Sequence, residues 1–193
     1  MNMEAMTLVV QEGDMLAFAL AVESMDIFEL NMLHDGLGYT TLLDYVLIRN
    51  NIPMTELLIR RNVNLNVESA WGETPLEHSI RYKLPDMLNL LVDAGVNLDW
   101  LNKNGFPMLH LAVHTHDKNI VAMLIESGVD VHAQDDNGWT ALQWAVYHAD
   151  IDICKILLDA GVSPDVPDIV GTTARDTAKT LEPEEQLLIE RLL

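Results

Sequence analysis

Glycine recurs at a nearly constant interval along this chain of 193 residues. The glycines are Gly38, Gly72, Gly105, Gly138 and Gly171, which are separated by 34, 33, 33 and 33 residues. A fixed period of about 20–50 residues indicates one supersecondary unit that is repeated and stacked on its neighbours. The period therefore predicts a solenoid, in which stability comes from contacts between adjacent units and a count of globular domains has little meaning.

A second series keeps the same period. Its members are Asn62, Gly95, Gly128 and Gly161, and each lies 10 residues before the next glycine of the first series. Gly and Asn tolerate the positive φ that tight turns and helix C-termini require. The two series together predict that each unit is a tight hairpin followed by two antiparallel helices, the second of which ends at the Gly or Asn of this second series.

The residues around both series resemble the ankyrin repeat. The first series reads Gly72-Glu-Thr-Pro-Leu76, Gly105-Phe-Pro-Met-Leu109 and Gly138-Trp-Thr-Ala-Leu142, and the second reads Leu90-Leu-Val-Asp-Ala-Gly95, Leu124-Ile-Glu-Ser-Gly128 and Leu157-Leu-Asp-Ala-Gly161. The match is specific because two independent motifs recur in phase. The resemblance implies an all-α repeat solenoid of stacked helix-turn-helix ankyrin units that are joined by short β-hairpin turns.

The resemblance also implies a division of residues 1–193 as a single ankyrin repeat domain. Its full repeats are 35–68, 69–101, 102–134 and 135–167, with a degenerate N-terminal cap at 1–34 and a C-terminal cap repeat at 168–193. Within the first cap we expect a helix pair over 3–24 and predict no conformation for the link 25–34. The first full repeat has one extra residue, which we place at 49–53 between its helices. Terminal repeats are expected to present a polar outer face.

Charge narrows the classes of partner. The chain has 30 acidic and 11 basic residues, a formal net charge of −19, and no Lys or Arg before Arg49. Nucleic acids and anionic membranes are bound through cationic side chains, so this composition argues against both as partners. It favours a basic protein partner, although an acidic surface can also serve solubility alone. The single cysteine and the absence of a signal sequence or long apolar segment favour a cytoplasmic protein.

No residue pattern indicates catalysis, a cofactor or a metal. His110, His114 and His116 invite a metal-site interpretation because helical residues four apart share a face. The resemblance instead implies that His110 bonds to backbone and braces neighbouring repeats, and we favour that interpretation. Cys154 is interpreted as a core residue because its phase matches Leu88 and Val121, and Trp144 is also assigned to the core. We therefore predict that the protein is not an enzyme.

What remains is a candidate surface for a protein partner. In ankyrin proteins the partner usually lies against the concave side, which hairpin tips and the inner ends of the first helices form. Carried over by phase, the partner-binding residues are Tyr39, Trp71, Glu73, Arg81, Tyr82, Lys103, Phe106, His114, Asp136, Trp139, Tyr147 and His148, with Leu37, Asn104, Asn137 and Thr115 beside them. Aromatic residues are effective interface anchors because they bury a large area at little cost in rotamer entropy. The alternative is that some of these aromatics pack against adjacent hairpins.

A small and highly acidic ankyrin chain resembles an inhibitor or sequestering protein that acts by steric masking. Concrete versions are an immunity protein or antitoxin that neutralises a basic toxin, or a viral anti-defence protein. The alternative is a scaffold or adaptor that bridges two partners without inhibiting either. Fold alone does not distinguish these functions.

Overall fold

The structure is a computed structural model, and it describes residues 3–32, 41–69 and 71–193. The chain forms two compact units, which we call the N-terminal unit (Met1–Asn97) and the C-terminal unit (Leu98–Leu193). The predicted fold class is confirmed, because the described residues are helical and form no sheet. Their strand-like pairing is limited to isolated antiparallel bridges in hairpin turns, Leu101 with Pro107 and Gln134 with Thr140.

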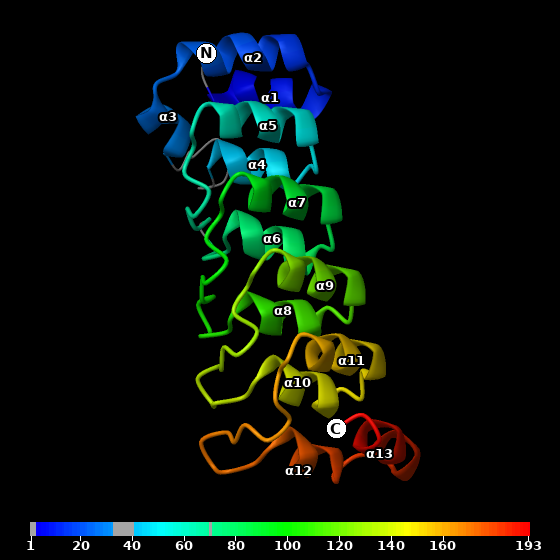
Figure 1. Ribbon diagram of the computed structural model, residues 1–193. Coiled ribbons are helices and arrows are strands. Elements are labelled where there is room, and N and C mark those ends of the chain that lie inside the picture. Colours follow the sequence, from blue (N-terminus) through cyan, green and yellow to red (C-terminus); the bar gives the residue numbers. More distant parts are fainter. Residues whose placement is uncertain (1–2, 33–40, 70) are drawn as a thin grey trace. The chain divides into compact units, whose positions relative to one another are not determined.

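Helix pairs stack in chain order within the N-terminal unit (Figure 1). Its helices are α1 (Met3–Glu12), α2 (Met15–Ser24), α3 (Ile27–Asn31), α4 (Leu42–Leu47), α5 (Ile52–Arg60), α6 (Pro75–Arg81) and α7 (Pro85–Asp93). Helix α2 packs against α5 and α5 against α7, while α4 packs against α6. The second helices α2, α5 and α7 therefore stack on one another, and the first helices of the two following pairs, α4 and α6, stack likewise.

The C-terminal unit repeats this arrangement (Figure 1). Its helices are α8 (Met108–His114), α9 (Lys118–Glu126), α10 (Ala141–Tyr147), α11 (Ile151–Asp159), α12 (Ala174–Ala178) and α13 (Pro183–Glu190). Helices α8, α10 and α12 stack in one layer, and α9, α11 and α13 stack in the other. The hairpins lie at the starts of α8, α10 and α12, so the residues after each hairpin glycine lie close to the first helix of their repeat.

The core consists of equivalent positions of successive repeats. Leu76, Leu109 and Leu142 are all buried, each two residues beyond the N-cap of its helix. Cys154 has no exposed surface either, as the sequence predicts. Burial raises the pKa of its thiol to about 12, so the thiolate that a nucleophile or metal ligand requires is disfavoured. Cys154 is therefore a packing residue.

Local sequence explains where the first helix of each repeat begins. The side chains of Thr74 and Thr140 accept hydrogen bonds from backbone N–H groups in the first turns of α6 and α10. Helix α8 begins instead after Pro107, which offers no such bond. Pro75 occupies the first turn of α6, where a missing N–H costs nothing.

Left-handed residues end the second helix of each repeat, as the period predicts. Gly95, Gly128 and Gly161 have φ of 81°, 87° and 90°, and Asn62 has φ of 56°. These values confirm that Asn62 takes the place of a glycine, because Asn is one of the few residues that visit this conformation readily. The turn between the two helices also contains a left-handed residue in each repeat, for example Lys83 with φ of 54°.

The prediction that the extra residue lies at 49–53 is wrong. The N-cap Thr41 precedes Asn62 by 21 residues, the interval that also separates the N-cap Thr74 from Gly95. The first full repeat is therefore regular from Thr41 onward. The additional residue must therefore precede Thr41. The sequence alone did not show this, because Gly38-Tyr-Thr-Thr contains two threonines, and either could be the N-cap of the helix. Gly38 itself lies outside the described residues.

The N-terminal cap has the predicted helix pair, but it is less polar outside than expected. Helices α1 and α2 meet at Gly13, whose φ is 71°, and the side chain of Asp14 caps α2. The unassigned link contains the short helix α3, which Asp26 and Glu29 fix through a reciprocal capping box. The end helices expose Leu16 and Leu20 of α2 and Leu187 and Leu188 of α13.

No helix in the described ranges is long and apolar enough to cross a membrane.

Candidate functional site

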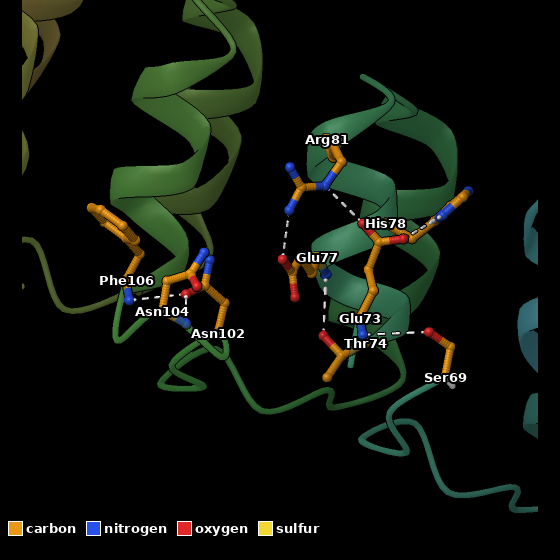
Figure 2. A network of polar contacts seen from close by, with 9 residues as sticks. All are labelled: Ser69, Glu73, Thr74, Glu77, His78, Arg81, Asn102, Asn104 and Phe106. Atoms are coloured by element: carbon orange, nitrogen blue, oxygen red, sulfur yellow. Dashed lines mark hydrogen bonds and ion pairs between the residues drawn. The ribbon is translucent and has the colours of Figure 1, made fainter. Parts of the chain in front are cut away.

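The candidate residues of the N-terminal unit centre on an ionic network at the start of α6 (Figure 2). Arg81 donates hydrogen bonds to two carboxylates, with Nε 2.7 Å from Oε1 of Glu73 and Nη2 2.7 Å from Oε1 of Glu77. Glu77 and Arg81 meet because residues four apart on a helix are neighbours. Glu73 lies just before the N-cap and reaches the same guanidinium from the hairpin side. The Arg81 side chain remains about half exposed, so a partner can reach it.

The two carboxylates of this network differ in pKa. Burial opposes ionisation of both. For Glu73 the hydrogen bonds from His78 and Arg81 outweigh burial, and its pKa is lowered. For Glu77 burial dominates over the bond from Arg81, and its pKa is raised. Its Oε2 atom is buried without a hydrogen bond. The exposed part of the network thus carries the ionised Glu73 beside Arg81.

Two predicted aromatic residues flank this network. Trp71 is 63% exposed and lines a small hollow with Glu73 and His78, and Tyr82 is 58% exposed at the end of α6. The ring of Tyr82 lies 4.3 Å from that of His78, whose Nδ1 is 3.3 Å from Oε2 of Glu73. His78 had no predicted role. Tyr39 and Leu37 of the predicted surface lie outside the described residues.

In the C-terminal unit the structure brings predicted residues into ring contact. We call Phe106, His114, Trp139, Trp144, Tyr147 and His148 the ring cluster. Trp144 is at its centre, with ring centroids 4.5 Å from His114, 4.9 Å from Trp139 and 5.8 Å from Phe106. Edge-on and tilted pairs at such distances are the favoured aromatic geometries.

The repeat geometry explains why these rings meet. Phe106 and Trp139 each follow a hairpin glycine, and His114 and Tyr147 each end the first helix of a repeat. Because α8 stacks on α10, rings from both repeats converge on one face of the unit. The assignment of Trp144 to the core is wrong, because its side chain is only partly buried. Its Nε1 donates to Oδ2 of Asp135, 2.9 Å away, which draws the indole towards the hairpin.

The histidines of the ring cluster favour the neutral form. Burial lowers the pKa of His114, with a further contribution from His116. Burial also lowers the pKa of His148, and His114 and His116 lower it further by charge repulsion. A depressed imidazole pKa keeps these rings uncharged at neutral pH. The ring cluster is therefore a largely apolar surface, and its exposed members are His114 and Tyr147.

The remaining predicted residues of this unit lie on hairpin tips. Lys103 and Asp136 are both exposed. The carboxylate of Asp136 packs over Gly105 so closely that a Cβ at Gly105 would meet it at 2.2 Å. Asp136 is therefore held beside the neighbouring hairpin, where it adds negative charge near Phe106.

His110 braces the repeats as the ankyrin resemblance implies. It is buried, its Nε2 lies 2.8 Å from the backbone oxygen of Trp139, and burial lowers its pKa. Gln143, 33 residues later, donates equivalently to the backbone oxygen of Thr172 at 2.9 Å. His110 thus lies inside while His114 is exposed. Across the described residues, no group of three or more His, Cys, Asp or Glu side chains is placed to hold a metal ion.

Some residues that contact the candidate surface were not singled out from the sequence, although the repeat pattern offered a signal for them. Trp144 and His78 share one repeat phase with Tyr45, and Asp168 shares its phase with Asp135 and Asn102. The exposed apolar pair Ile169 and Val170 belongs to the hairpin before α12, which the sequence assigns only to a terminal cap. The one signal for this pair was that an isoleucine and a valine occupy a hairpin tip.

Comparison with known proteins agrees with this geometry. A family model described as ankyrin repeats (3 copies) matches residues 80–168. Residues 80–168 therefore match ankyrin repeats, and the chain has the ankyrin repeat fold. Its fold is similar to the crystal structure of an ankyrin repeat domain from Acinetobacter baumannii AYE, with a TM-score of 0.84 and 23% sequence identity over 99% of this chain and 96% of that chain. No curated protein matches the chain.

Ankyrin repeats generally mediate protein–protein interaction, and domains built from them are typically not enzymes. This general role suits the surfaces of both units, which offer aromatic rings, carboxylates and a guanidinium.

Proposed function

We propose that the protein binds a basic protein partner through the hairpin-and-helix face of its repeats and that it inhibits this partner by covering a functional surface. The observation that carries the proposal is the ring cluster. Six rings from two repeats are gathered where ankyrin proteins usually bind their partners, and Tyr147 and His114 remain exposed. Surface aromatics of this kind provide the large, rigid contact area typical of binding hot spots.

Polar groups in each of the two units support a basic partner. Asp136 lies on a hairpin tip, and Glu73 stays ionised beside Arg81. The net charge of −19 attracts a cationic protein at long range and raises its association rate. The same charge disfavours nucleic acids and anionic membranes as partners. A cytoplasmic location is part of the proposal and is supported by the single, buried cysteine.

Inhibition by steric masking fits the described part of the chain, which offers surfaces for binding and in which no reactive centre is recognised. An immunity protein against a basic toxin, or an anti-defence protein, would work in this way. The second candidate function is an adaptor. It is favoured by the different chemistry of the two units, an ionic network around Arg81 in one and the apolar ring cluster in the other, because two unlike surfaces can hold two partners.

The test begins with affinity capture by the full chain and by three variants in a lysate of the native host. Phe106→Ala and Trp139→Ala remove rings of the cluster. Phe28→Ala is the matched control, because Phe28 is a 72% exposed aromatic outside the cluster. We expect a basic protein that the full chain and Phe28→Ala capture and that both cluster variants lose.

The captured protein then decides the mechanism. Addition of the full chain at stoichiometric amounts should abolish the activity of the partner, and Trp139→Ala should restore it. Two proteins that bind together and keep their activities would favour the adaptor. A partner that the cluster variants retain in full would contradict the proposed surface.

A further inference from the structure

A surface hollow lies beside the ring cluster, between the last two hairpins of the C-terminal unit. Its volume is about 280 Å³, and it is lined by Asn137, Trp139, Trp144, Asp168, Ile169 and Val170. A drug-sized ligand typically occupies about 300–1,000 Å³. The hollow is open and smaller, so it suits one long side chain of a partner better than a complete small-molecule ligand.

Close hairpin contacts fix the walls of this hollow. The N–H of Ile169 donates to the backbone oxygen of Asn137 at 3.2 Å. A Cβ at Gly138 would meet the backbone nitrogen of Ile169 at 2.9 Å, so the two hairpins touch without space for a side chain between them. Walls held in this way need little reordering when a ligand enters, which favours binding.

One wall of the hollow carries a negative charge. Oδ1 of Asp168 accepts from the backbone N–H groups of Val170 and Thr172 at 2.9 and 2.8 Å, and Oδ2 accepts from Nε1 of Trp139 at 3.1 Å. Burial opposes ionisation of Asp168, but these bonds outweigh it and lower its pKa. Because all of these donors are neutral, they orient the carboxylate without cancelling its charge.

The other walls are aromatic and aliphatic. Trp139 and Trp144 lie at one side, with ring centroids 4.9 Å apart, and Ile169 and Val170 are 73% and 79% exposed at the rim. Such exposed branched residues on a hairpin tip contribute nothing to the core. They are placed to pack against the methylene groups of an incoming side chain.

We propose that this hollow binds an arginine side chain of the partner. The guanidinium would stack on Trp139 and pair with Asp168, while its methylene stem lies along Ile169 and Val170. Arginine fits better than lysine because its planar group can stack on an indole while one N–H donates to the remaining acceptor site on Oδ2 of Asp168, whereas an ammonium is a compact, strongly hydrated charge. The inference rests on the proposed function, since it names the feature of a basic partner that the C-terminal unit recognises.

The test follows the indole N–H signals of the full chain by ¹H–¹⁵N NMR during titration. The probes are the N-acetyl methylamides of arginine, lysine and citrulline, the last being an uncharged analogue of arginine. We expect the arginine probe to shift the Trp139 and Trp144 signals saturably. Trp71 and Trp100, which do not line the hollow, are internal controls and should stay in place. Lysine should bind more weakly, and citrulline should have no effect.

Asp168→Asn is the decisive variant, because the chain itself shows that Asn keeps the two backbone bonds of this hairpin, while the variant loses the charge and the Oδ2 acceptor of the Trp139 indole. Asn102 occupies the equivalent hairpin position, and its Oδ1 accepts from the backbone N–H groups of Asn104 and Phe106 at 2.9 and 3.0 Å, as Figure 2 shows. Loss of one charge-assisted pair should weaken the arginine probe about tenfold.

Three results would overturn the arginine site. They are an absence of saturable shifts at Trp139, equal affinity for the arginine and lysine probes, or unchanged affinity in Asp168→Asn. Failure here is separable from failure of the proposed function, because Phe106 does not line the hollow. If Phe106→Ala loses the partner while the arginine probe does not bind, the proposed partner surface is still supported and only the arginine site is refuted.

Discussion

Replacement of Gly138 by alanine should destabilise the protein more than the same change at Gly161. Both glycines are left-handed, with φ of 76° and 90°. They differ in what a Cβ would meet. At Gly161 nothing lies within 4 Å, whereas at Gly138 the backbone nitrogen of Ile169 lies at 2.9 Å and the Cα of Asp168 at 3.1 Å. The pair therefore separates backbone strain from a collision between hairpins.

The magnitudes follow from these two effects. An alanine in the left-handed region costs about 1–2 kcal/mol, which applies to both variants. At Gly138 the atoms in the way belong to backbone and cannot rotate aside, so the hairpin 168–172 must move. Overpacking of this kind typically costs about 1–3 kcal/mol more. We expect a loss of about 1–2 kcal/mol for Gly161→Ala and about 2–5 kcal/mol for Gly138→Ala.

Urea unfolding followed by far-ultraviolet circular dichroism measures both losses, with the slope of each transition compared to that of the unmodified chain. Repeat arrays can unfold in more than one step, so the comparison uses transitions of equal slope. Equal losses at the two glycines would refute the close packing of the hairpins. They would also remove the argument that the walls of the hollow are fixed.

Three further predictions concern the core, pH and salt. Leu109→Ala should cost about 2–5 kcal/mol in urea unfolding, because it leaves a cavity at a fully packed repeat position. Stability should fall as pH drops below about 6.5, since burial lowers the folded-state pKa of His110 and the unfolded chain takes up the proton first. His110→Gln should lessen this fall between pH 7 and 5 while keeping the brace, because Gln143 makes the same bond in the next repeat. Finally, raising salt should slow association with the partner and leave dissociation less affected, as stopped-flow or surface-plasmon measurements would show.

The period of the sequence was sufficient for the fold because each repeat obeys the same local rules. Left-handed glycines, threonine caps and buried leucines are properties of single positions, so phase alone predicts them. The extra residue of the first repeat was misplaced for a related reason. The repeat period shows only that an extra residue lies between Gly38 and Asn62. The start of the helix at Thr41 shows that this residue lies before the helix and not after it.

The candidate site was less predictable because it depends on the directions of side chains. Phase places Phe106, His114 and Trp139 on one face, but only the structure shows that their rings surround Trp144. Trp144 follows buried Leu142 on a helix and so resembled a core residue. The hydrogen bond from its indole to Asp135 draws the ring towards the hairpin. That bond joins two residues nine positions apart, one in the hairpin and one in the helix, so it does not follow from the position of Trp144 in its helix alone.

The most direct test of the central claim is the dissociation rate of the purified partner from four forms of the protein. These are the unmodified chain, Phe106→Ala, Trp139→Ala and the control Phe28→Ala, each checked for helical content by circular dichroism. If the ring cluster holds the partner, Trp139→Ala should raise the dissociation rate by about 30-fold or more, which corresponds to about 2 kcal/mol. Phe106→Ala should act in the same direction, and Phe28→Ala should leave the rate unchanged. Unchanged dissociation in both cluster variants, with their helices intact, would contradict the claim that this surface binds the partner.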